Sequence, residues 1–181
     1  MTKPVLVVMG VSGSGKSTLG EALSKRLGWP FQEGDDLHPP ANIAKMSAGV
    51  PLTDADRAPW LAAVGAWIDG RIAAGGGGVI TCSALKAAYR KTLTQGRPSV
   101  RLIYLDADEA VIERRVAARK GHFMPASLVA SQFADLEPPG LEEGAIVVLA
   151  DQPIGAQVDT ALEALLTVRV SPQYSPSPER P

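Results

Sequence analysis

The residues best suited to chemistry lie near the N-terminus, where Gly10-Val11-Ser12-Gly13-Ser14-Gly15-Lys16-Ser17 has the pattern G-x-x-x-x-G-K-[ST]. Glycines at these spacings let backbone N–H groups turn inward around a phosphate, and a following helix adds the positive end of its dipole. Lys16 would reach the β- and γ-phosphates, and the Ser17 hydroxyl would be a magnesium ligand. A chance match is the alternative, but the octapeptide lies between an apolar strand pattern and a helical one. We therefore predict that residues 10–18, ending with Thr18, bind the phosphates of ATP with magnesium.

Acidic residues follow the second predicted strand, in Glu33-Gly34-Asp35-Asp36-Leu37-His38-Pro39. Ligands gather at the carboxyl ends of strands in doubly wound sheets, so these acids could face the γ-phosphate. One carboxylate there could orient or deprotonate a hydroxyl nucleophile, and a second could hold magnesium through its water shell. The alternative is that the acids cap a loop and that His38 is a structural hydrogen-bonding residue.

A basic segment, Arg114-Arg115-Val116-Ala117-Ala118-Arg119-Lys120-Gly121-His122, lies further along the chain. Arg115 and Arg119 are four residues apart and share one face of a predicted helix. Arginines placed in this way can clamp the oxygens of a transferring phosphoryl group, as in a lid that closes over the substrates. The alternative is an ordinary solvated charged face.

Several classes of nucleotide-binding protein have to be separated. The chain contains neither the D-x-x-G nor the [NT]-K-x-D motif of a GTPase, and the strand predicted at Val79–Cys82 lacks the terminal acid of many ATPases. A kinase needs an acceptor pocket beside the γ-phosphate and a mobile basic segment that excludes water, and both candidates are present. A kinase of a small molecule is therefore favoured over a hydrolysing switch or motor and over a non-enzymatic regulator.

Periodicity predicts an α/β architecture around these residues. Strands are expected at Val5–Met9, Trp29–Glu33, Val79–Cys82, Val100–Leu105 and Ala145–Ala150. Helices are expected at Ser17–Leu27, Ala41–Ser47, Lys86–Thr94, from Asp108 through Arg119, Ser127–Leu136 and Ile154–Val168. Another helix is expected to begin at Pro59, and the glycine run 75–78 is expected to break the chain before the third strand. Alternating strands and helices imply a parallel sheet covered on both faces.

Composition limits the class further. The chain has 181 residues, which suits a single domain over residues 1–170, and its formal net charge of −1 favours neither nucleic acid nor membrane as a partner. Cys82 is the only cysteine, and no signal peptide or long apolar run is apparent, so a cytoplasmic location is expected. Residues 171–181 are rich in proline and serine and are expected to be disordered.

Short motifs follow one another in order over residues 4–168. After the phosphate loop they are Gly34-Asp35-Asp36-Leu37-His38-Pro39 with Asn42 and Lys45-Met46, Gly49 to Leu61 with the pattern D-x-D-R-x-P-W-L, Cys82-Ser83-Ala84-Leu85-Lys86 with Tyr89-Arg90, Ala118 to Met124 with G-H-F-M, and Ser131-Gln132-Phe133 with Leu136-Glu137-Pro138. With these motifs the chain resembles the gluconokinases, small P-loop kinases related to shikimate and adenylate kinases. The phosphate loop alone indicates only a P-loop protein, whereas the other motifs are far more specific.

The resemblance implies transfer of the ATP γ-phosphoryl group to the 6-hydroxyl of D-gluconate, which feeds the pentose phosphate or Entner–Doudoroff pathway. It also implies a three-layer P-loop fold like that of the nucleoside monophosphate kinases, with a five-stranded parallel sheet in the order 2-3-1-4-5, a small lid at about residues 119–137, and a homodimer.

The resemblance also implies roles for individual residues. Asp35 would orient or deprotonate the 6-hydroxyl, and Lys16, Arg115 and Arg119 would act on the phosphates. Gluconate would be bound by His38, Lys45, Arg57, Lys86 and His122, together with Asp35. Gln152 and Pro153 would pack against adenine. The family often has Asp where this chain has Glu33, and either acid can serve magnesium through water, beside Ser17.

Overall fold

The computed structural model describes residues 3–118 and 126–168. Its centre is a parallel sheet of five strands in the order β2-β3-β1-β4-β5, which confirms the expected order. The strands are β1 (Lys3–Met9), β2 (Phe31–Gln32), β3 (Gly76–Thr81), β4 (Val100–Asp106) and β5 (Ile146–Leu149). The second strand is shorter than the expected Trp29–Glu33, and the others lie close to their predicted places.

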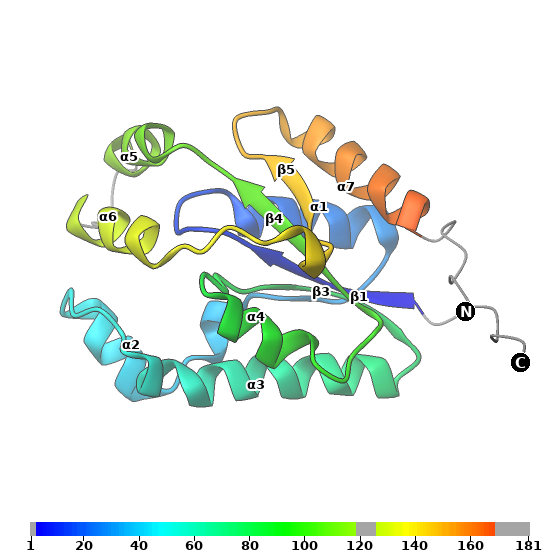
Figure 1. The fold of residues 1–181 in the computed structure, drawn as a ribbon, viewed down its shortest axis with the longest axis horizontal. Helices are drawn as coiled ribbons and strands as arrows, with labels where there is room; N and C mark the ends of the chain where they lie inside the picture. Colours follow the sequence, from blue (N-terminus) through cyan, green and yellow to red (C-terminus); the bar gives the residue numbers. More distant parts are fainter. Residues whose placement is uncertain (1–2, 119–125, 169–181) are drawn as a thin grey trace, which may run out of the picture.

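Helices cover both faces of the sheet and its carboxyl end. They are α1 (Lys16–Leu27), the 3₁₀ turn η1 (Gly34–Leu37), α2 (Pro40–Ser47), α3 (Asp54–Ala73), α4 (Ala87–Thr94), α5 (Glu109–Ala118), α6 (Ala126–Asp135), the 3₁₀ turn η2 (Leu141–Glu143) and α7 (Ile154–Val168). In Figure 1, α3 and α4 lie on one side of the sheet and α1 and α7 on the other, while α2, α5 and α6 lie beyond the end where the strands finish. Among the described helices, none is both long and apolar enough to cross a membrane.

The central strand β1 is buried on both faces, which explains why its sequence is continuously apolar. Val5, Val7 and Met9 pack with the residues of α3 and α4 in one cluster. Leu6 and Val8 point to the opposite face and pack with residues of α1 and α7 in a second cluster. Side chains alternate between the two faces of a strand, so a strand buried on both faces needs apolar residues at every position.

The start of α3 differs from the expected one. The helix begins at Asp54 and not at Pro59, because Thr53 and Asp56 form a capping box. Thr53 Oγ1 accepts a hydrogen bond from the Asp56 N–H at 3.2 Å, and the Asp56 carboxylate accepts one from the Thr53 N–H at 2.9 Å. Pro59 lies inside the helix, where its missing N–H removes one backbone hydrogen bond without ending the element.

The glycine run was also interpreted wrongly, because Gly76, Gly77 and Gly78 form the first half of β3. A Cβ atom on Gly76 would lie 2.1 Å from the carbonyl oxygen of Lys3 in β1, and one on Gly78 would lie 2.8 Å from the Trp67 ring. Neighbouring groups approach so closely that these positions hold only a hydrogen atom. The glycines therefore permit the strand rather than break it.

Candidate active site

The phosphate loop, residues 10–17, connects β1 to α1 as predicted. Gly10, Gly13 and Gly15 have positive φ angles of 143°, 80° and 102°, which only glycine adopts without strain. A Cβ on Gly10 would also lie 2.8 Å from the carbonyl oxygen of Leu105 in β4. These glycines shape a loop of backbone N–H groups at the N-terminus of a helix, which is an anion-binding arrangement.

Lys16 begins α1, and its side chain turns back over the loop. Its Nζ donates a hydrogen bond to the Val11 carbonyl oxygen at 3.0 Å. Burial lowers the pKa of Lys16, and the nearby Asp35 and Glu33 carboxylates oppose that shift. Lys16 is thus held at the loop with the predicted acids close enough to influence its charge.

Glu33 and Ser17, the two predicted magnesium ligands, are in direct contact. Ser17 Oγ donates to Glu33 Oε2 at 2.5 Å, and the Thr81 hydroxyl donates to Glu33 Oε1. Thr81 ends β3 and was not predicted, although its place at the end of a strand beside β1 was a usable signal. Hydroxyl and carboxylate oxygens are hard ligands, and magnesium usually takes only one or two carboxylates together with water and phosphate. These residues therefore fit a magnesium ion beside the phosphate loop.

The turn η1 presents Asp35 to the site. Its first residue, Gly34, donates its N–H to Thr81 Oγ1 at 2.9 Å and accepts a hydrogen bond from Trp60 Nε1 at 2.8 Å. A Cβ on Gly34 would lie 1.8 Å from the Thr81 carbonyl oxygen, so no other residue fits there. The next side chain, that of Asp35, is 69% exposed and lines the cavity at the phosphate loop. The backbone of this turn is therefore fixed, while the Asp35 carboxylate is exposed in the cavity.

His38 is buried against the ring of Trp60, with centroids 4.3 Å apart and an interplanar angle of 14°. The Asn42 amide lies 3.2 Å from His38 Nδ1, and since Asn42 Nδ2 can only donate, Nδ1 accepts. The ring proton is therefore on Nε2, which lies 3.9 Å from Asp35 Oδ1. Burial lowers the pKa of His38, against the opposing influence of Asp35. His38 is held as a neutral donor beside the predicted base.

Lowering the pH should destabilise the protein through His38. Below the ordinary histidine pKa of about 6.5, the unfolded chain takes up a proton that the folded chain does not, so this stability is lost as the pH falls. Urea unfolding at pH 7.5 and 5.5 should therefore show a larger loss for the wild type than for His38→Gln. The other histidine is present in both proteins, so its effect cancels. Equal losses in the two proteins would contradict the buried neutral state.

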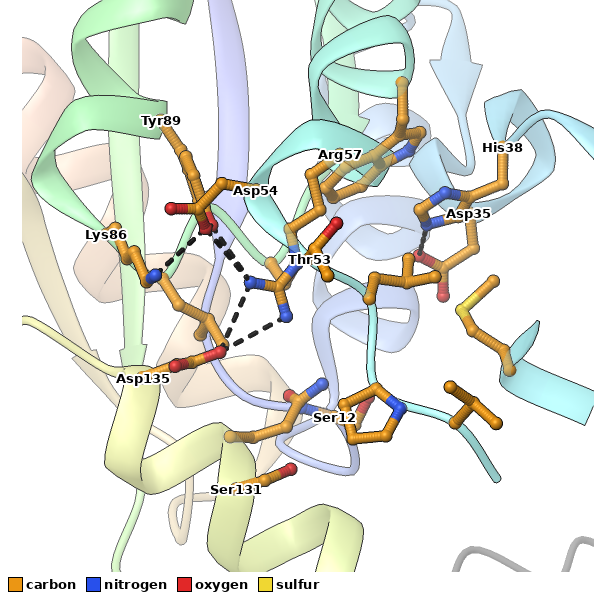
Figure 2. A pocket seen from close by; sticks show the side chains of 18 of the residues that line it. Ser12, Asp35, His38, Thr53, Asp54, Arg57, Lys86, Tyr89, Ser131 and Asp135 are labelled. Carbon is orange, nitrogen blue, oxygen red and sulfur yellow. Dashed lines mark hydrogen bonds and ion pairs between the residues drawn. The ribbon is translucent and has the colours of Figure 1, made fainter. Parts of the chain in front are cut away.

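Next to His38 and Asp35 lies a cavity of about 680 Å³, within the usual range for small-molecule sites. One side is formed by what we call the acceptor wall: Asp54, Arg57, Lys86, Tyr89 and Asp135. Arg57 donates to Tyr89 Oη at 2.9 Å and to Asp135 Oδ2 at 3.2 Å, and Lys86 donates to Asp54 Oδ1 at 2.9 Å. The Tyr89 hydroxyl donates to Asp54. Figure 2 shows this wall facing His38 and Asp35 across the pocket.

The structure therefore brings together two predicted gluconate-binding cations, Arg57 and Lys86. It also adds the three other members of the acceptor wall, which sequence reasoning missed. Asp54 lies in a motif that carried the family resemblance, and so does Tyr89, but neither received a role. Asp135 had no signal of its own, because its partner Arg57 is 78 residues away.

Lys45 does not line the cavity. Its Nζ donates to both carboxylate oxygens of Asp56, at 2.7 and 2.8 Å. These hydrogen bonds, with those from Thr53, lower the pKa of Asp56 to about 2. Lys45 thus supports the cap of α3 in this structure.

The Arg115 side chain is not simply solvated on a charged helix face. Its guanidinium donates to the Ser14 carbonyl oxygen at 3.2 Å and to the Ala150 carbonyl oxygen at 2.6 Å, so it ties α5 to the phosphate loop and to the end of β5. Gln152 lies three residues after the end of that strand, and its carbonyl oxygen accepts a hydrogen bond from Gln157 Nε2 at 2.8 Å. Arg119 and His122 lie outside the described residues.

Comparisons with known proteins agree with this arrangement. A family model described as an AAA domain matches residues 5–139. A gluconokinase of Gluconobacter oxydans (strain 621H) is 51% identical over 161 residues, or 89% of this chain and 88% of that protein. The thermoresistant gluconokinase of Escherichia coli (strain K12) is 42% identical over 162 residues, with coverage of 89% and 93%. The crystal structure of a gluconokinase from Sinorhizobium meliloti 1021 has a TM-score of 0.83 at 46% identity, with coverage of 92% and 94%.

A phosphate loop, a carboxylate beside it and a cavity lined by paired cations and carboxylates define a P-loop kinase of a small molecule. The relatives narrow this class of kinases to one family, since the two similar sequences and the similar crystal structure are all gluconokinases. The chain belongs to the gluconokinase family, which confirms the resemblance inferred from its motifs.

Proposed function

We propose that the protein transfers the γ-phosphoryl group of ATP to the 6-hydroxyl of D-gluconate and releases ADP and 6-phospho-D-gluconate. One observation carries the proposal in this member of the gluconokinase family. A single cavity is lined by Lys16 of the phosphate loop, by Asp35, and by Arg57 and Lys86 of the acceptor wall. Phosphate-binding groups, a candidate base and cations for an acid substrate therefore share one space.

Each group has a distinct part in the transfer. The bond between the 6-oxygen and the γ-phosphorus forms while the bond from that phosphorus to the β,γ-bridging oxygen breaks, and Asp35 takes the hydroxyl proton. Lys16 and the loop N–H groups hold the phosphates and balance the negative charge that develops on them. Ser17 and Glu33 would hold a magnesium ion, which neutralises phosphate charge when bound.

The acceptor wall supplies the chemistry that a sugar acid requires. A carboxylate calls for a cation, and Arg57 can bind it with two parallel N–H groups, supported by Lys86. Hydroxyl groups call for mixed donors and acceptors, which the Nε2–H of neutral His38 and the Tyr89 hydroxyl provide. Lys45 would take part only after leaving Asp56.

The remaining roles complete the proposal. Gln152 and Pro153, after β5, would pack against adenine, and Arg115 would reach the phosphates from its present contact with the loop. The single kinase domain over residues 1–170 and the lid at about residues 119–137 stay predictions, and Arg119, His122 and residues 171–181 lie outside the described residues. We further propose a homodimer in the cytoplasm.

A panel of acceptors tests the proposal. ADP release, coupled to a pyruvate kinase and lactate dehydrogenase assay, should be stimulated far more by D-gluconate than by shikimate or AMP, because the chain belongs to the gluconokinase family. Formation of 6-phosphogluconate should be confirmed by its oxidation with a specific dehydrogenase. If shikimate or AMP were the best acceptor, or if ADP formed at the same rate without any acceptor, the proposal would be wrong.

A further inference from the structure

Gln132 of α6 makes a contact that has no part in the chemistry above. Its Oε1 accepts a hydrogen bond from the backbone N–H of Ser12 at 2.7 Å, across 120 residues of sequence. Gln132 also lines the cavity that contains Lys16 and Asp35. A side chain from α6 is thus fixed on the phosphate loop, at the place where the donor phosphates and the acceptor meet.

The chemistry of the contact determines which way the Gln132 amide faces. The Ser12 N–H can only donate, so the amide oxygen must be the end that faces it. The Nε2 amino group then points away from Ser12 with two N–H donors. In a cavity built for phosphate and sugar hydroxyls, such donors meet an acceptor oxygen when the substrates are bound.

The same face of α6 also reaches the acceptor wall. Gln132 and Asp135 are three residues apart, which places them on one side of the helix, and Asp135 holds Arg57 at 3.2 Å. On the donor side, the same helix reaches the phosphate loop through the hydrogen bond from the Ser12 N–H to Gln132 Oε1. Helix α6 therefore spans the donor and acceptor halves of the cavity, with Gln132 at the donor end.

We propose that Gln132 is a further catalytic residue: its Nε2 donates to a terminal oxygen of the γ-phosphoryl group while its Oε1 remains bound to the Ser12 N–H. Negative charge is spread over these oxygens in the transition state, and a neutral donor held in advance by the loop stabilises it without reorganisation. The inference rests on the proposed kinase function. The alternative is that Gln132 only occupies the Ser12 N–H in the absence of nucleotide, and that its side chain moves away when the nucleotide binds.

The variant Gln132→Glu separates these roles, because it keeps an oxygen for the Ser12 N–H and replaces the donor with a negative charge. We expect affinity for a non-hydrolysable ATP analogue to fall by at least about tenfold, since like charges repel at short range. Affinity for ADP, which has no γ-phosphate, should stay within about twofold. Isothermal titration calorimetry measures both, and Gln95→Glu, the same change at an exposed position after α4, is the matched control.

A second variant, Gln132→Met, removes both ends of the amide with little change in shape. Its kcat with gluconate should fall by about 30- to 100-fold while affinity for the ATP analogue changes little. Tighter ATP binding with unchanged kcat would instead establish that Gln132 only occupies the Ser12 N–H in the absence of nucleotide. Equal losses of ADP and ATP affinity in Gln132→Glu would reduce Gln132 to a structural support. If the wild type failed to phosphorylate gluconate, the proposed function would fail, while the two nucleotide titrations would still decide where the Nε2 group points.

Discussion

Replacing Lys16 with alanine should lower the kcat for gluconate phosphorylation by roughly 10²–10³-fold, as expected for the loss of one charged group that stabilises transferring phosphate. Charge increases on the phosphoryl oxygens and on the leaving group during transfer, so the ammonium contributes more to the transition state than to the bound substrate. Steady-state kinetics with saturating ATP and gluconate measures the effect.

The fold should survive this change. The Lys16 side chain donates a hydrogen bond to the Val11 carbonyl oxygen, and its burial already disfavours its charge. Thermal unfolding should therefore be close to that of the wild type. Lys25→Ala, at an exposed position in the last turn of the same helix, is the control and should leave kcat unchanged. A Lys16→Ala enzyme with turnover within a few-fold of the wild type would remove Lys16 from the mechanism.

Replacing Asp35 with asparagine should lower kcat by about 10²–10⁴-fold, the usual range for loss of a general base. The amide keeps the size of the side chain and can still orient a hydroxyl, but it cannot take the proton. Because the Asp35 side chain is exposed in a turn fixed by Gly34, Thr81 and Trp60, the change should not disturb the backbone. ATP affinity should remain within a few-fold of the wild type.

The neighbouring residue provides a matched control. Asp36 belongs to the same 3₁₀ turn and is also exposed, but it does not line the cavity. Asp36→Asn should therefore have nearly normal kcat. If Asp36→Asn proved the more damaging of the two, the base would have been assigned to the wrong carboxylate.

The extent to which the sequence predicted this site depends on how local each contact is. The phosphate loop is a continuous segment whose glycine spacing determines its conformation, so all of its residues could be identified. Ser17 was named from the phosphate-loop pattern and Glu33 from the family resemblance. The structure places the two side chains in contact, and their part in binding magnesium stays a prediction. Glu33 has a partner in Thr81 that lies 48 residues further on, and only the place of Thr81 at the end of a strand could have indicated that contact.

The acceptor wall was harder to predict because its contacts join distant parts of the chain. Arg57 and Lys86 were named only through the family motifs, and their carboxylate partners were not predicted. Lys45 was assigned to substrate only through the family resemblance, and that role stays a prediction; in the structure its Nζ donates to the capping carboxylate of Asp56. The start of α3 was wrongly expected at Pro59, and recognising the Thr53–Asp56 capping box would have placed it at Asp54.

The acceptor wall has a consequence for selectivity. Its cations already have anionic partners from the chain itself, and hydrogen bonds from Tyr89 and then Lys86 lower the pKa of Asp54, which keeps that partner ionised. If the acceptor wall binds the substrate as proposed, we expect the carboxylate of a sugar acid to displace Asp54 or Asp135 from its cation. A neutral hexose has no charge with which to displace them, so we expect it to bind in this cavity much more weakly than a sugar acid.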